Sequence, residues 1–183
     1  MPASECGEGF LPDGKEGCEP ILPADPCPEG QMAVPGDAEC HEVSPCGNGT
    51  WGDIPVEADT EFVDQAYAGG NSDGTQVKPW TTIQQGVDIA AKGAIVAVAA
   101  GSYPEDVVIK GKPVRLWGRC PAMVEIVGTG VESATIWVRK NAGGTEIRGV
   151  AVTGAKLGIS VSGSSDILIE RVWIHGAGSV GIG

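Results

Sequence analysis

A repeat of about 22 residues near the end of the chain is the feature that most restricts its fold. Residues 147–155, IRGVAVTGA, align with residues 169–177, IERVWIHGA, and residues 157–159 match residues 180–182 at a spacing of 23. Short strands that recur at a fixed period are typical of a solenoid, in which each repeat buries its apolar side against its neighbours.

From residue 95 onward the chain consists of short β-branched runs separated by Gly, Asn, Ser and Pro, which predicts further strands. Because side chains alternate along a strand, we expect Val150, Val152, Val172 and Ile174 to point inward. The predicted strands are 95–98, 107–109, 114–117, 124–127, 135–138, 147–152, 158–161, 167–174 and 180–182.

One amphipathic helix is expected before these strands, over residues 82–91. Thr81 or Thr82 can cap its start, and Ile83, Val87 and Ala90 give it one apolar face. A first repeat exposes unpaired strand edges and apolar side chains, so a helix of this kind is suited to cover that end.

A longer pattern accompanies this helix: Phe62-Val-Asp, Gly70-Asn-Ser-Asp-Gly74, Lys78-Pro-Trp80-Thr-Thr-Ile83 and Gly101-Ser-Tyr103-Pro-Glu105. It resembles the capping region of pectin-lyase-like proteins, and residues 147–183 resemble the coils of that superfamily. The resemblance implies an all-β fold, a right-handed parallel β-helix (solenoid) with one N-terminal capping α-helix. It implies no single activity, because the superfamily includes polysaccharide lyases, hydrolases, esterases, adhesins and non-enzymatic surface proteins.

Five of the six cysteines fall in the first 46 residues, in two similar units that each begin Cys-x-Glu-Gly and end in a second cysteine. Units this short cannot bury a core and need covalent bonds. Six cysteines allow 15 pairings. The repeat favours Cys6–Cys18 and Cys27–Cys40, which leaves Cys46–Cys120.

Charge and cysteine content divide the chain into a predicted acidic, disulfide-rich leader, 1–60, and a β-helix, 61–183, with its cap in 61–93 and its coils in 94–183. Residues 1–64 contain 15 acidic residues and one lysine, a balance of −14, whereas residues 65–183 have a balance of +2. The acidic tract argues against binding to nucleic acid, and no apolar run is long enough to span a membrane. The disulfides predict an extracytoplasmic protein, secreted or at the cell surface, and the leader resembles those of surface proteins of gliding, predatory bacteria.

Metal sites are weakly supported. Zinc modules usually contain close cysteine pairs, which are missing here, so we interpret His41 beside Cys40 as a surface residue. Asp64, Asn71 and Asp73 could form a calcium loop, but turn formation explains this segment without an ion. We therefore predict no metal and no cofactor, with calcium as the alternative.

No catalytic constellation is expected within residues 1–183, because the acidic residues of the coils are scattered. His175-Gly176 resembles a fragment of the polygalacturonase histidine motif, but it lacks the partner carboxylates and aligns with Thr153. Arg115, Arg148 and Glu170 are expected to face outward, with Arg148 and Glu170 as an exposed ion pair.

Three tryptophans are the candidate ligand-binding residues. Trp117, Trp137 and Trp173 each follow or separate inward-facing residues, so each should face outward, where an indole can stack on a sugar ring. We expect Trp117 and Trp173 on the same sheet. The alternative is that loops or the disulfide-bearing segment cover them.

Two classes of function remain. The first is an exported, non-catalytic module or scaffold that binds glycans or proteins. The second is a polysaccharide lyase or glycoside hydrolase whose active site lies beyond residue 183. The repeat stops partway through a coil, so we also expect the β-helix to continue beyond the chain end, or the open coil to self-associate.

Overall fold

The computed structural model describes residues 6–183, so residues 1–5 of the predicted leader lie outside the described residues. The chain divides into two compact units, Met1–Val43 and Ser44–Gly183. The predicted boundary at residue 60/61 stays a prediction. Most of the regular structure is β-strand, with a single short helix among the described residues.

The smaller unit consists of two antiparallel hairpins, each closed by a disulfide. Strands β1 (Phe10–Pro12) and β2 (Cys18–Pro20) form the first hairpin, and β3 (Gln31–Ala33) and β4 (Cys40–Glu42) form the second. Among residues 6–43 no hydrophobic side chain is buried. Covalent bonds therefore replace a core here, as expected for units this short.

Three disulfides are present, and they join the pairs that the spacing favours: Cys6–Cys18, Cys27–Cys40 and Cys46–Cys120. No cysteine among the described residues is free. Three disulfides indicate folding in an oxidising, extracytoplasmic environment.

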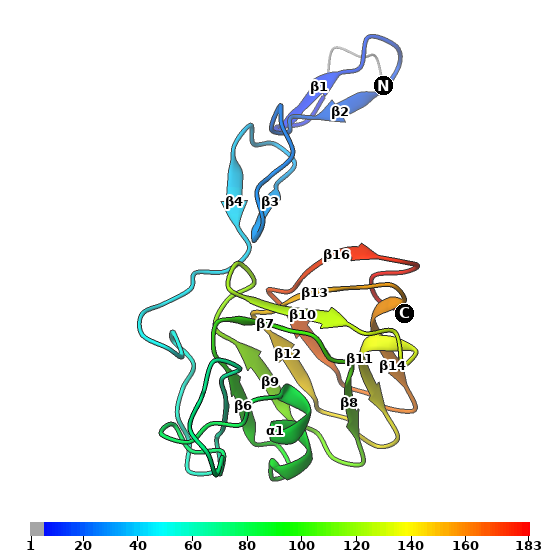
Figure 1. Ribbon diagram of the computed structural model, residues 1–183. Coiled ribbons are helices and arrows are strands. Elements are labelled where there is room, and N and C mark those ends of the chain that lie inside the picture. The colour runs from blue at the N-terminus through cyan, green and yellow to red at the C-terminus, as the bar shows by residue number, and fades with distance from the viewer. Residues whose placement is uncertain (1–5) are drawn as a thin grey trace. The chain divides into compact units, whose positions relative to one another are not determined.

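The larger unit contains the helix and the remaining strands, most of which Figure 1 labels. Its elements are β5 (Glu61–Val63), α1 (Ile83–Ile89), β6 (Ile95–Val98), β7 (Gly101–Tyr103), β8 (Val107–Lys110), β9 (Arg115–Gly118), β10 (Val124–Gly128), β11 (Ala134–Arg139), β12 (Glu146–Arg148), β13 (Ala151–Gly154), β14 (Leu157–Ser162), β15 (Leu168–Glu170) and β16 (Trp173–Ala177).

These strands form three parallel sheets. The first sheet has the order β15-β12-β9-β6-β5, the second β16-β13-β10-β7 and the third β14-β11-β8. From β6 onward, consecutive strands lie in different sheets. Each strand from β9 onward pairs with the strand three places before it (Figure 1). We call one passage through the three sheets a circuit.

The core forms where inward-facing residues at the same position of successive circuits stack on one another in ladders. Val96, Leu116, Ile147 and Ile169 pair in register across the first sheet, and the first three are fully buried. One main apolar cluster joins such ladders from all three sheets. Each inner side chain therefore loses water by contact with the circuit before and after it.

The helix begins and ends close to the predicted residues. Thr82 is its N-cap, and Thr82 and Gln85 form a reciprocal capping box. Ile83 and Val87 are buried against the first strands, as the apolar face predicts. The Glu105 carboxylate also accepts hydrogen bonds from the backbone N–H of Ile83 at 2.7 Å and Gln84 at 2.9 Å, which fixes the helix start to the first circuit.

Three predicted strands differ from the structure. The predicted strand 180–182 is only an isolated bridge between Ile182 and Ile159. The runs 147–152 and 167–174 are each divided between the first and second sheets, because Gly149 and Arg171 adopt left-handed backbone conformations with φ of 65° and 53°. These residues form corners, so the chain turns from one sheet into the next within an apparently continuous apolar run. A short strand, β7, was also not predicted.

The segment 44–57, which we call the covering segment, contains no strand but belongs to the larger unit. The Cys46–Cys120 disulfide bonds it to the end of β9. Trp51 packs edge-to-face on Phe62, with ring centroids 4.8 Å apart. The covering segment therefore lies over the outer face of the first sheet.

Candidate functional site

Trp117 lies on the outer face of the first sheet, where the covering segment meets it. Its register neighbours are Ala97 on β6 and Arg148 on β12. Trp51 and Ile54 of the covering segment pack with Trp117 around the buried outer-face side chains of β5 and β6. Trp117 thus faces outward as predicted, but it is half-buried, and the disulfide-bearing segment covers part of it.

A cavity of about 280 Å³ lies beside this indole, and we call it the Trp117 pocket. Residues 117–119, 148–149 and Arg171 line it from the sheet side, and residues 44–45 and 53–55 of the covering segment line the opposite wall. One circuit after another therefore contributes residues to the same recess.

The pocket is rich in hydrogen-bond donors. Three of the five arginines of the chain line it, whereas Asp53 is its single lining carboxylate. Arg119 donates to the backbone carbonyl oxygens of Cys46 at 3.0 Å and Gly47 at 3.2 Å, and no carboxylate among the described residues pairs with it. The formal charge of the lining side chains is three positive and one negative, a balance of +2.

Arg148 is held between two carboxylates and the indole. Its Nη2 lies 3.1 Å from Glu146 Oε2, its Nε lies 3.4 Å from Glu170 Oε2, and its guanidinium carbon lies 4.9 Å from the centre of the Trp117 ring. The predicted pairing of Arg148 with Glu170 across the repeat is confirmed. Arg171 is more exposed, with its Nε 3.5 Å from Glu170 Oε1.

Several polar atoms at this site are buried without a hydrogen bond. One is Trp117 Nε1. Arg148 Nε and Glu146 Oε2 are two others, because the ion pairs of Arg148 do not meet hydrogen-bond geometry. A buried donor without an acceptor is unfavourable by about 1–3 kcal/mol, so such groups are rare in folded proteins. Two donors and one acceptor beside the pocket are therefore left without hydrogen-bond partners.

Arg115 lies at the far end of the covering segment and anchors it. Its two terminal nitrogens donate to the two Glu57 oxygens at 2.9 and 2.5 Å, and its Nε donates to the carbonyl of Gly93. The hydrogen bonds from Arg115 hold the pKa of Glu57 below its ordinary value, and the same bonds raise the pKa of Arg115. This fork-to-fork pair is the strongest geometry available to an arginine and a carboxylate.

The other two candidate tryptophans lie elsewhere. Trp137 is on β11 of the third sheet, where its Nε1 donates to Ser162 Oγ and the Arg139 guanidinium lies 3.9 Å from its ring centre. Trp173 is on β16 of the second sheet. The expectation that Trp117 and Trp173 share a sheet is wrong, because the corner at Arg171 turns the chain before Trp173 is reached.

His175 lies in β16 two residues after Trp173, where the pairing with β13 shifts register between Val152 and Gly154. Its ring stacks on the Trp173 indole with centroids 3.9 Å apart, and its Nε2 lies 3.1 Å from Glu125 Oε1. Glu125 is the one carboxylate of the described chain within ion-pair distance of His175. The arrangement does not correspond to the paired carboxylates of a glycosidase.

The possible metal ligands are engaged in turns. Asp64 accepts from the backbone N–H of Ala66, and Asp73 accepts from both the N–H and the hydroxyl of Thr75. These bonds from Thr75, its hydroxyl first, lower the pKa of Asp73. Asn71 occupies a left-handed turn position with φ of 61°. Among residues 6–183 no cluster of three or more His, Cys, Asp or Glu side chains could hold a metal ion.

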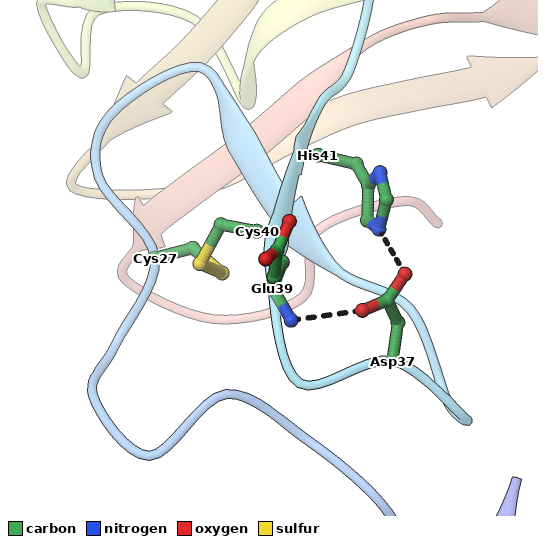
Figure 2. Close-up of a disulfide and its surroundings, with 5 residues drawn as sticks. All are labelled: Cys27, Asp37, Glu39, Cys40 and His41. Carbon is green, nitrogen blue, oxygen red and sulfur yellow. Dashed lines mark hydrogen bonds and ion pairs between the residues drawn. A yellow bond between two sulfur atoms is a disulfide. The ribbon is translucent and has the colours of Figure 1, made fainter.

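His41 is paired locally, as Figure 2 shows. Its Nε2 lies 2.7 Å from Asp37 Oδ2, while the backbone N–H of Glu39 donates to Asp37 Oδ1 at 2.9 Å. The N–H of Glu39, followed by His41, lowers the pKa of Asp37. His41 and Cys40 therefore belong to a disulfide-closed hairpin.

The sequence did not predict that Arg119, Arg171 and the covering segment form one site. One signal was present: Arg119 precedes Cys120, so the expected Cys46–Cys120 bond already places the segment around residue 46 beside this arginine. The position of Arg171 had no such signal, because an arginine in a left-handed corner is uncommon.

Comparisons with protein-family models, with curated proteins and with solved structures found no match. Within the described part of the chain, no helix is both long and apolar enough to cross a membrane.

Proposed function

We propose that this protein is an exported, non-catalytic glycan-binding module, that its larger unit is a right-handed parallel β-helix of the pectin-lyase-like kind, and that acidic sugars occupy the Trp117 pocket. The order of strands supports the fold, because a chain wound into a β-helix adds one strand to each of its three parallel sheets in every turn. Crossovers between parallel strands are right-handed in about 98% of cases, which supports that hand.

The observation that carries the binding proposal is the half-buried Trp117 in a recess that three arginines also line. Sugar rings present an apolar face that stacks on aromatic side chains and a rim of oxygens that accept hydrogen bonds. A sugar in this pocket can therefore stack on the indole ring while its rim oxygens accept hydrogen bonds from the lining arginines.

The chemistry of the pocket favours a sugar that carries a carboxylate or a sulfate. Guanidinium groups bind planar oxyanions through paired N–H donors. Arg119 and Arg171 retain N–H groups that no carboxylate of the described chain uses in aligned hydrogen bonds. Neutral sugars would leave these donors unpaired, so acidic glycans are the better ligands.

A binding role is preferred to catalysis because the pocket has only one lining carboxylate, Asp53, which is exposed. Glycosidases need two carboxyl groups on opposite sides of the scissile bond. Export is supported by the three disulfides.

The test is a titration of the full chain, followed by tryptophan fluorescence or calorimetry, with polygalacturonate, dextran sulfate and neutral dextran. We expect at least one acidic polymer to bind and neutral dextran not to bind. Trp117→Ala should weaken binding by about 30-fold, the usual effect of a central aromatic contact. Trp137→Ala, on another sheet, is the matched control and should bind as the parent does.

A charge-matched pair separates specific contacts from general attraction. Arg171→Gln removes a lining charge and should weaken binding by about 10-fold, whereas Arg139→Gln removes the same charge on the third sheet and should have little effect. A flat response of the parent protein to all three polymers would refute the glycan proposal. Equal losses in the two arginine variants would refute the pocket as the binding site.

A further inference from the structure

The covering segment is held to the sheets by side chains and a disulfide rather than by backbone hydrogen bonds. It contains no strand, and among the described residues no backbone–backbone hydrogen bond joins it to one. Its far end is tied by the Glu57–Arg115 ion pair, and its middle packs through Trp51 and Ile54. Its near end depends on the Cys46–Cys120 disulfide and on the two Arg119 hydrogen bonds to carbonyl oxygens.

The disulfide lies at the end that forms the pocket wall. Cys46 directly follows Ser44 and Pro45, which line the pocket, and Cys120 directly follows the lining residue Arg119. The two cysteines also differ in access, since Cys46 is half-buried whereas Cys120 is fully buried. Cys46 is the more exposed residue of the pair, so we expect a reductant to attack its sulfur first.

We propose that the Cys46–Cys120 disulfide is a redox lock on the Trp117 pocket, a regulation that rests on the proposed glycan-binding function. In the oxidised protein the covering segment forms one wall and Arg119 is fixed toward it. When a dithiol reduces the bond, the near end of the segment is freed, the wall opens and the affinity for the ligand falls.

The exchange is balanced by the dithiol. One of its thiolates attacks Cys46 Sγ, the Cys46–Cys120 bond breaks, and its electron pair goes to Cys120 Sγ, which takes up a proton. The second thiolate of the reductant then attacks the first reductant sulfur, which is bonded to Cys46 in the mixed disulfide. This step releases Cys46 Sγ, which is also protonated. Two electrons pass to the protein, and the reductant leaves as a cyclic disulfide.

Only weak contacts remain at the near end after reduction. The Arg119 guanidinium still faces the carbonyls of Cys46 and Gly47, but each such bond to a mobile segment contributes little net stability. Neither cysteine belongs to the main apolar cluster or to a paired strand. Cys120 lies two residues after the end of β9. The strands should therefore stay folded while the pocket opens.

The experiment uses the full chain in three forms: the parent, Cys46→Ala/Cys120→Ala, and the matched control Cys27→Ala/Cys40→Ala, whose disulfide lies in the smaller unit. Affinity for polygalacturonate and dextran sulfate is measured with acrylamide quenching of tryptophan fluorescence on the same samples. We expect the first variant to bind at least 10-fold more weakly and to be quenched more strongly, and the control to match the parent. Trp117→Phe in each background identifies the indole responsible.

The result that overturns the lock is a folded Cys46→Ala/Cys120→Ala variant with parental affinity and parental quenching. Should that variant not fold, the parent is reduced with dithiothreitol and its β-sheet circular dichroism is recorded. Retained dichroism with stronger Trp117 quenching supports the lock, whereas lost dichroism overturns it, because the bond would then hold the fold. If the oxidised parent binds neither polymer, the glycan proposal fails, while the quenching comparison still decides whether the bond closes the pocket.

Discussion

Substituting Gly149 by alanine tests the contact between successive circuits at the corner of the first sheet. Gly149 has a φ of 65°, and a Cβ at this position would meet the carbonyl oxygen of Gly118 in the preceding circuit well inside van der Waals distance. The left-handed conformation costs a non-glycine residue about 1–2 kcal/mol. Overpacking against a neighbour that cannot move adds about 1–3 kcal/mol. We therefore expect a loss of about 2–5 kcal/mol in the free energy of unfolding.

Gly111→Ala is the matched control for that substitution. Gly111 also has a positive φ, 75°, but a Cβ at this position would meet only open space. The control shares the conformational strain and the change in the unfolded chain, so the difference between the two variants isolates the clash. Urea denaturation followed by circular dichroism measures both. Equal losses in the two variants would contradict the close stacking of Gly118 and Gly149.

Two further predictions concern stability. Asp106 accepts hydrogen bonds from the backbone N–H groups of residues 129–132 and from the Thr129 hydroxyl, so Asp106→Ala should lower the free energy of unfolding by about 1–3 kcal/mol in urea at pH 7. Desolvation raises the pKa of Asp106, but the hydrogen bonds, led by that from the Glu132 N–H, outweigh it, and the pKa is lowered. The stabilisation is therefore complete above about pH 5 and is lost as the pH falls through the folded-state pKa. An effect of Asp106→Ala that is equal at pH 7 and pH 2 would contradict this. Cys27→Ala/Cys40→Ala removes a disulfide of sequence separation 13, which the chain-entropy model equates with a loss of about 2.9 kcal/mol in stability. The hairpin of β3 and β4 should unfold and its amides should exchange with solvent, while the melting of residues 44–183 should not change. Unchanged hydrogen exchange in residues 27–42 would contradict this prediction.

The sequence predicts the strands well but not their assignment to sheets. Apolar alternation identifies inner residues such as Leu116 and Ile147, because burial in a ladder demands it. The corners depend on single backbone conformations. Gly149 is a recognisable corner, whereas Arg171 is not, since left-handed arginine has no local preference.

Variable circuit length explains the error over Trp117 and Trp173. Successive passes through the first sheet, measured at the paired residues 95, 115, 146 and 168, are 20, 31 and 22 residues long. A period of 22 taken from the last two circuits therefore cannot be extended back to Trp117. Long turns carry the difference, and turn length is weakly constrained by the packing of the strands.

The candidate site could be predicted only in part for a similar reason. Trp117 and Arg148 were recognised as outward residues because strand alternation fixes that property. The pocket also needs the covering segment, which is irregular and is positioned by a disulfide and a few side chains. No periodic pattern encodes such a segment.

The indole N–H signals in a ¹H–¹⁵N spectrum give the most direct test of the proposed binding site. The chain has five tryptophans, and Trp80 and Trp137 already donate to Glu61 and Ser162, whereas Trp117 has no acceptor among the described residues. Each signal is assigned with a Trp→Phe variant, and the protein is titrated with short oligomers of polygalacturonate and of dextran sulfate. We predict that the Trp117 signal shifts on binding because the ligand contacts its ring, while the signals of Trp80 and Trp137, which do not line the pocket, stay in place. Binding that moves the Trp137 or Trp173 signal and leaves Trp117 unchanged would contradict the proposed binding site.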